Sequence, residues 1–121
     1  MTFDTGALIA LERNKRRVVE IFQNVFRRGE DITVPAAVIT EWWRGRTDLR
    51  EDILDSVVIE PLDNVIAKSA GEALAEVRGA TAIDAIVMAS AARRGDLVLT
   101  SDVGDLERLR AFFPGVRVLG A

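Results

Sequence analysis

The sequence predicts an α/β domain with a central, mostly parallel sheet of about five short strands flanked by helices. Short β-branched or apolar runs alternate with longer stretches whose apolar residues recur at helical spacing. Such alternation is typical of a parallel sheet covered on both faces. A chain of 121 residues that is 49% hydrophobic can also build a core of its own. We therefore expect one domain over residues 1–121.

The strands are predicted from the short apolar runs. They lie at residues 1–3, 32–34, 57–59, 97–99 and 116–119. Pro114 and Gly115 form a turn signal directly before the last of them. The spacing of the runs leaves room for a helix between consecutive strands.

Helices are predicted where apolar residues recur every three or four positions. Residues 18–26 and 66–77 show this amphipathic pattern, whereas residues 82–92 are almost entirely apolar and predict a buried helix. Pro35 suits the first turn of a helix after the second strand. Gly29 and Gly95 suit helix ends.

Four acidic residues lie on or directly after apolar segments: Asp4, Glu41, Asp84 and Asp102. Carboxylates in such surroundings cost free energy unless a cation, a proton or a hydrogen-bond donor compensates them. Asp4 and Asp102 directly follow predicted strands, and ligands of open parallel sheets bind beyond the carboxyl ends of the strands. We therefore expect the four carboxylates to converge on one cleft that binds a metal ion.

Composition narrows the chemistry of this cleft. The chain has no His and no Cys, which excludes zinc sites built on those residues, thiolate nucleophiles, disulfides and imidazole acid–base catalysis. Hard cations such as Mg²⁺ or Mn²⁺ accept carboxylate and water ligands. Because Mg²⁺ usually binds one or two carboxylates together with substrate phosphate, the composition points to a phosphate-containing substrate.

The acidic segments also carry a family resemblance. DTGALIAL, ITEWWRG, IDAIVMASA and LTSDVGDL, in this order, resemble the PIN domain of the type II toxin-antitoxin ribonucleases, the VapC family, over essentially the whole chain. The resemblance implies a PIN-like fold and a metal-dependent endoribonuclease that acts as a toxin. It also implies that Asp4, Glu41, Asp84 and Asp102 are the catalytic acids and that Asp105 is an accessory acid.

The same resemblance implies cofactor and partners. Asp4, Asp84, Asp102 and Asp105 would hold Mg²⁺ or Mn²⁺, and the RNA products would carry a 5′-phosphate and a 3′-hydroxyl. A small cognate antitoxin would place a basic side chain among the acids, and the chain would form a homodimer.

One position departs from the family pattern. The family usually has a hydroxyl or amide side chain where this chain has Gly6. That departure leaves Thr5 and Ser101 to hold Asp4 and Asp102 by hydrogen bonds.

Basic and aromatic residues suggest how RNA and a partner are held. The formal charge is −3, which disfavours nucleic-acid binding, but removing the four acids and Asp105 from the 19 acidic residues leaves 14 against 16 basic ones. We expect Arg44 and Arg46 to contact RNA, in preference to the basic cluster at residues 13–17. Trp42 and Trp43 point about 100° apart on a helix, so one belongs to the core and the other suits a partner contact.

Simpler interpretations of the acids stay open. Asp4 and Asp102 suit ordinary helix N-caps, and Thr81 with Asp84 suits a variant of the capping box. Glu41 does not start a helix; alone, it suits a solvated side chain or one paired with Arg44.

Other functions stay open as well. One is a catalytically weak PIN-like module that binds RNA or protein, which the intact set of four acids opposes. Another is a metal-dependent nuclease or phosphatase with a non-RNA substrate, which the acids alone do not distinguish. No apolar run approaches the roughly 18 residues of a membrane span, and MTFDT lacks a secretion signal, so we expect no membrane association and a cytoplasmic location.

Overall fold

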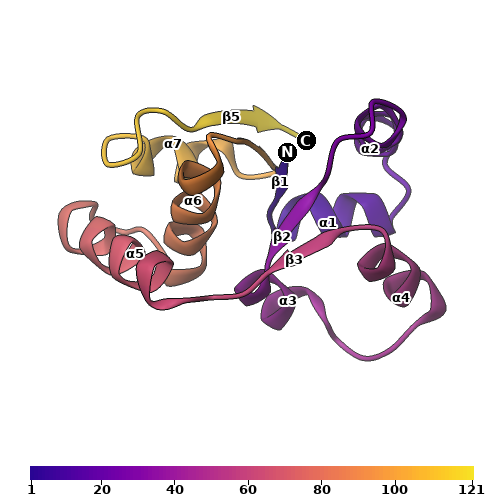
Figure 1. Cartoon of the computed structure of the whole chain (residues 1–121), viewed down its shortest axis with the longest axis horizontal. Coiled ribbons are helices and arrows are strands. Elements are labelled where there is room, and N and C mark those ends of the chain that lie inside the picture. Colours follow the sequence, from indigo (N-terminus) through magenta and orange to yellow (C-terminus); the bar gives the residue numbers. More distant parts are fainter.

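A computed structural model describes all residues, 1–121, as seven helices and a five-stranded sheet (Figure 1). In chain order the elements are β1 (Thr2–Phe3), α1 (Thr5–Glu12), α2 (Arg16–Arg27), β2 (Thr33–Pro35), α3 (Ala36–Trp42), α4 (Asp48–Asp55), β3 (Val58–Glu60), α5 (Asn64–Glu76), α6 (Ala82–Arg94), β4 (Leu97–Thr100), α7 (Val103–Leu109) and β5 (Arg117–Gly120). All five predicted strands are present to within about one residue at each end.

The sheet is entirely parallel, with the strand order β3-β2-β1-β4-β5. β2 and β3 continue from β1 towards one edge, whereas β4 lies on the other side of β1, with Phe3 opposite Leu99. The order of the strands therefore reverses between β1 and β4. In open α/β sheets this switch point is where ligands bind, beyond the carboxyl ends of the strands.

The helices lie in two groups. Figure 1 shows α5 and α6 side by side, well away from α2 and α4. In α6 the residues from Val87 to Ala91 are all buried, as its apolar composition predicts, and Gly95 ends the helix in the left-handed conformation at φ 64°. Pro35 lies one position before its predicted place, because it ends β2 and is the N-cap of α3.

The turn between α1 and α2 is closed by its own backbone. Asn14 adopts φ 57°, and the Lys15 N–H donates to the Ala10 carbonyl at 2.9 Å. Asn tolerates the left-handed region better than other residues that carry a side chain, and this bond is the closing bond of a Schellman-type helix end. The chain therefore leaves α1 and enters α2 through a tight turn.

The core lies between the sheet and its helices. Phe3, Val34 and Leu99 from the three central strands are fully buried, and Leu8 of α1 and Met88 of α6 are buried with them. Burying each such side chain stabilises the fold by about 1.5–3 kcal/mol. None of the helices has the length and apolar character that a bilayer crossing requires.

A polar network also crosses the domain. Arg94, at the end of α6, pairs with Glu60 of β3, donates to the Thr2 hydroxyl of β1 at 2.6 Å, and lies 3.6 Å from Asp96. The hydroxyls of Thr2 and Ser90 are inaccessible to solvent and are both hydrogen-bonded within this network. Arg94 thus links β1 and β3 to the turn that precedes β4.

Candidate acidic site

The fold brings the predicted acids to the switch point of the sheet. Asp4 follows β1, Asp102 lies two residues beyond the end of β4, Asp84 is in the first turn of α6, and Glu41 lies in α3. α1 packs against α3, α3 against α6, and α6 against α7, so the elements carrying these residues are consecutive neighbours. The four carboxylates therefore share one edge of the domain.

Asp4 is the most buried of them, with 7% of its surface exposed. It caps α1, because its Oδ1 accepts the Ala7 N–H at 2.9 Å, so the capping interpretation is confirmed for this residue. Burial raises the pKa of Asp4 most strongly, hydrogen bonds from Thr100 and Ala7 oppose the rise, and repulsion from Asp84 and Asp102 adds to it. Asp4 is thus both a cap and a member of a repulsive cluster.

Asp84 is half-buried at the start of α6, where the Thr81 hydroxyl accepts its N–H at 3.2 Å. Thr81 is therefore the N-cap, as the capping-box variant predicts. Burial raises the pKa of Asp84 most, a hydrogen bond from Thr81 lowers it, and repulsion from Asp105, Glu41 and Asp102 raises it further. Asp84 is thus within electrostatic reach of Glu41, Asp102 and Asp105, and its own charge raises the pKa of Asp4.

Asp102 and Asp105 form an exposed pair. Asp102 occupies the N-cap position of α7, as the capping interpretation predicts, but its side chain makes no capping hydrogen bond to the backbone of the helix. A hydrogen bond with Asp105 is the largest influence that raises the pKa of Asp102 and the largest that lowers the pKa of Asp105. Asp105 also pairs with Arg108 at 2.6 Å. Asp102 is therefore the harder of the two carboxyls to ionise.

Glu41 is exposed and held by a hydroxyl from another helix. The Thr5 Oγ1 donates to Glu41 Oε1 at 2.6 Å, so in this structure Thr5 holds Glu41 rather than Asp4. Arg44 donates its Nε–H to the Glu41 backbone carbonyl at 3.1 Å and makes no ion pair with the carboxylate. Glu41 is therefore positioned from α1, by the residue that follows Asp4 in the chain.

Thr100 is a site residue that sequence reasoning missed. Its side chain is fully buried at the end of β4. Its Oγ1 accepts the Asp102 N–H at 2.9 Å, and its hydroxyl lowers the pKa of Asp4, against the effect of burial. The Thr100 hydroxyl thus acts on both the segment that follows β1 and the segment that follows β4.

Gly6 leaves room for Ser101. A Cβ on Gly6 would lie 1.9 Å from Ser101 Oγ, 2.9 Å from its Cβ and 3.2 Å from its backbone nitrogen. Ser101 therefore occupies the space that a side chain at position 6 would need. Ser101 was expected to hold Asp102, but no hydrogen bond joins the two residues. Ser101 instead packs against Gly6.

The carboxylate oxygens of the acidic site are suitable ligands for a hard cation. Their positions, however, do not form a complete coordination shell. No three acidic side chains are close enough to hold one ion together. Mg²⁺ typically needs only one or two carboxylates because it retains several waters. Repulsion among the acids adds to the raised pKa values of Asp4 and Asp84, after the larger effect of burial, and a bound cation would relieve that repulsion.

The basic residues are arranged differently from the expectation. Arg46 lies 3.0 Å from Asp48 and 3.7 Å from Glu51, so its charge is already compensated. Arg13 and Lys15, from the cluster given lower preference, are exposed and have no acidic partner. The uncompensated charges therefore favour the cluster at residues 13–17 over Arg46 as a candidate contact for RNA.

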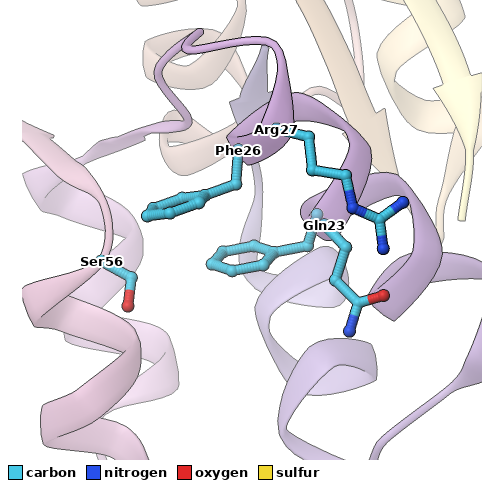
Figure 2. Close-up of a pocket in the computed structure, with 5 residues that line it drawn as sticks. Gln23, Phe26, Arg27 and Ser56 are labelled. Atoms are coloured by element: carbon cyan, nitrogen blue, oxygen red, sulfur yellow. The ribbon is translucent and has the colours of Figure 1, made fainter.

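The aromatic pair separates as expected. Trp42 is 2% exposed and belongs to the core, which leaves half-buried Trp43 for a partner contact. A separate hollow of about 330 Å³ lies between α2 and α4 and contains none of the acids. Figure 2 shows the Phe26 ring extending from α2 towards Ser56, and 65% of Phe26 is exposed. This hollow is a surface feature distinct from the acidic site.

Comparisons with known proteins agree with this geometry. The sequence profile of the PIN domain family matches residues 1–111. Among solved structures, DNA-bound VapBC from Salmonella typhimurium aligns with a TM-score of 0.77 at 17% identity, covering 98% of this chain and 96% of the other. VapBC2 from Rickettsia felis, bound to a promoter DNA fragment, gives 0.78 at 11% identity, covering 99% and 97%. A toxin-antitoxin complex from Klebsiella pneumoniae gives 0.67 at 20% identity, covering 95% and 93%. No curated protein matches the chain.

Proposed function

We propose that this chain, which belongs to the PIN domain family, is a metal-dependent endoribonuclease and the toxin of a type II toxin-antitoxin pair. The observation that carries the proposal is the repulsive cluster of Asp4, Asp84 and Asp102 at the switch point of a parallel sheet. Structures named as toxin-antitoxin complexes share its fold over nearly their whole length, which supports the toxin role.

Each acid has a role that its surroundings support. Asp4, Asp84 and Asp102 would hold Mg²⁺ or Mn²⁺, with Asp105 as an accessory ligand. The ion supplies a coordinated water of lowered pKa and positive charge against the phosphate oxygens. Glu41 is exposed and fixed by Thr5, which suits it to orient the attacking water.

Metal dependence is the first test of the proposal. The purified chain, free of antitoxin, should cleave RNA with Mn²⁺ or Mg²⁺ and lose cleavage in excess EDTA, because no His or Cys is present to act as base or nucleophile. Asp84→Asn should lower the cleavage rate by at least about a hundredfold, the scale of a lost catalytic electrostatic group. Asp63→Asn, at another helix start outside the cluster, is the control and should cleave like the parent.

Full activity in EDTA contradicts the metal mechanism, and a change of only a few-fold in Asp84→Asn returns Asp84 to a structural role. The same assay separates the other functions. Cleavage of DNA or of a chromogenic phosphate ester in preference to RNA assigns a different substrate. Binding of RNA without any cleavage assigns a non-enzymatic module.

The partner proposal rests on exposed apolar side chains. An antitoxin would cover Trp43 and the hollow between α2 and α4, where Phe26 is the most exposed large apolar residue. Phe26→Ala should weaken antitoxin binding by about 2 kcal/mol if the ring is an anchor. Val65→Ala, equally exposed on α5, is the matched control. Equal affinities of both variants, measured by calorimetry, exclude Phe26 as an anchor.

Two expectations remain predictions. A homodimer is implied by the family resemblance, and light scattering at micromolar concentration checks it. Cytoplasmic location is the other, checked by fractionation of cells that express the chain with its antitoxin.

A further inference from the structure

Two adjoining hollows lie where α1 ends and α2 begins. The first, of about 320 Å³, is lined by Gly6, Ile9, Ala10, Arg13, Lys15 and Ser101. The second, of about 380 Å³, shares Ala10, Lys15 and Ser101 with the first and adds Arg16, Arg17, Val18 and Ala121. We call the two together the basic groove.

The charges of the basic groove are largely uncompensated. Arg13 and Lys15 are exposed and make no ion pair or side-chain hydrogen bond. Arg17 donates only to the Gly120 carbonyl, at 3.0 Å, and Arg16 alone has an acidic partner, Glu20 at 3.0 Å. The charges of Arg13, Lys15 and Arg17 therefore line a small volume without an ion-pair partner. The C-terminal carboxylate belongs to Ala121, which lines the second hollow, so the positive charges still outnumber the negative one and the local potential is positive.

The start of α2 adds to this potential. Lys15 is the N-cap without a capping bond, and no acidic residue lies in the first turn. The positive end of a helix favours anions and disfavours cations, yet here the flanking residues are cations. A bound anion would relieve both unfavourable contributions.

The basic groove adjoins the acidic site through the chain itself. Ser101, which lines both hollows, directly precedes Asp102. Gly6, which lines the first, is two residues after Asp4 and faces Ser101. A molecule that reaches the acids therefore has the basic groove next to it.

We infer that the basic groove binds the phosphodiester backbone of the RNA next to the phosphate that is cleaved. This inference rests on the proposed function and adds to it the place where the substrate strand continues. A strand with one phosphate at the acids carries further phosphates beyond it, which suits a second, cationic subsite. An acidic peptide is the competing occupant, and it lacks a group that the acidic cluster would accept.

Binding in EDTA tests the inference without cleavage. A fluorescent single-stranded RNA is titrated with the parent and with the double variant Arg13→Ala/Lys15→Ala over a range of salt concentrations. Each lost phosphate contact lowers the slope of log affinity against log salt by about 0.7, so the double variant should lose about 1.4 in slope and roughly 25-fold in affinity near 0.1 M salt. Lys68→Ala/Arg78→Ala changes the net charge equally, away from the groove, and should match the parent.

Three results overturn the inference: an unchanged slope in the groove variant, an equal loss in the control variant, or RNA binding kept while binding of poly-L-glutamate is lost. The exchange Arg13→Lys/Lys15→Arg keeps the charges and should bind RNA like the parent, which guards against a folding defect. In the cleavage assay the groove variant should raise KM and leave kcat unchanged. RNA binding through the groove without cleavage contradicts only the proposed function, and cleavage with an unchanged groove variant contradicts only this inference.

Discussion

Asp4 and Asp63 both occupy the N-cap of a helix, yet the pKa of Asp4 is raised from its ordinary value and the pKa of Asp63 is lowered. Burial raises the pKa of Asp4 most, with repulsion from Asp84 and Asp102 adding to the rise. At Asp63 the bond from the Ile66 N–H is the largest influence that lowers the pKa. The ionised carboxylate of Asp4, disfavoured by burial and by its acidic neighbours, therefore opposes folding, whereas that of Asp63 supports it.

This contrast gives a prediction for stability in EDTA. Asp4→Asn should raise the melting temperature at pH 7, by roughly 4 °C if the charge costs about 1 kcal/mol, because Asn keeps the capping oxygen and removes the repelled charge. Asp63→Asn should lower it. Mn²⁺ should raise the melting temperature of the parent more than that of Asp4→Asn, since the variant lacks a ligand. A lower melting temperature for Asp4→Asn, measured by circular dichroism, rejects the repulsive cluster.

The sign of the pH dependence follows from the same shifts. Folded Asp4 retains its proton to a higher pH than unfolded Asp4, so its contribution to the free energy of unfolding falls as pH rises from its ordinary pKa to its raised one. Asp63 contributes stability above its ordinary pKa, and that stability is lost as pH falls through its lowered one. The gain from Asp4→Asn should therefore vanish at pH values below the ordinary pKa of Asp. A gain that persists there has another cause.

At the same scale, the sequence predicts the carboxylates better than the groups that hold them. An acid in an apolar segment is conspicuous, since burying it needs compensation. Thr100 is not conspicuous, because Thr is a common residue in strands and the segment LVLT has the composition of an ordinary strand. Thr5 was expected to hold Asp4 by a hydrogen bond, but it donates to Glu41. This contact depends on how α1 packs against α3, which the sequence does not show.

At the scale of elements, Gly6 decides how closely α1 approaches the turn after β4. A side chain there meets Ser101 Oγ at 1.9 Å, which rotation relieves, but also Ser101 Cβ at 2.9 Å, which it does not. Gly6→Ala should therefore push the segments of Asp4 and Asp102 apart. Overpacking of this kind costs about 1–3 kcal/mol, partly offset by the better helix propensity of Ala.

The expected result is a cleavage rate lowered about tenfold in Gly6→Ala, because small misplacements of catalytic groups are costly. Ser101→Gly in the same chain should restore most of the rate, since it removes the clashing atoms. Gly71→Ala in α5, where no atom lies within 4 Å, should instead stabilise the chain by up to about 1 kcal/mol and leave cleavage unchanged. No rescue in the double variant would falsify the steric role of this pair.

Element predictions succeeded where the apolar pattern was strong. The strands and the amphipathic helices α2 and α5 follow from periodicity. α4 was not predicted. Only Ile53 among its eight residues is buried, and Leu49 is half-exposed, so its sequence shows almost no amphipathic pattern. Its position depends on contacts from distant parts of the chain, such as the pair between Arg50 and Glu12 of α1.

At the scale of the whole molecule, Arg94 is the only residue that contacts side chains from β1, β3 and α6 in one polar network. Arg94→Met should lower the free energy of unfolding by roughly 2 kcal/mol, between the values for exposed and buried ion pairs, because Glu60 loses its cation in a partly buried place. Urea unfolding measures this change. Cleavage per folded molecule should be unchanged, since none of the five acids belongs to the network.

The strand order has a consequence for when the acidic site comes into being. β1 and β4 are neighbours in the sheet although more than ninety residues separate them in the chain. A ribosome releases the N-terminal part first, and contacts between distant residues form only after the later segment has emerged. Asp4 is thus synthesised almost at once but has no Asp102 beside it until β4 joins the sheet. The nascent chain therefore lacks an assembled acidic site for most of its own translation, and whatever chemistry that site performs cannot begin until the protein is nearly complete.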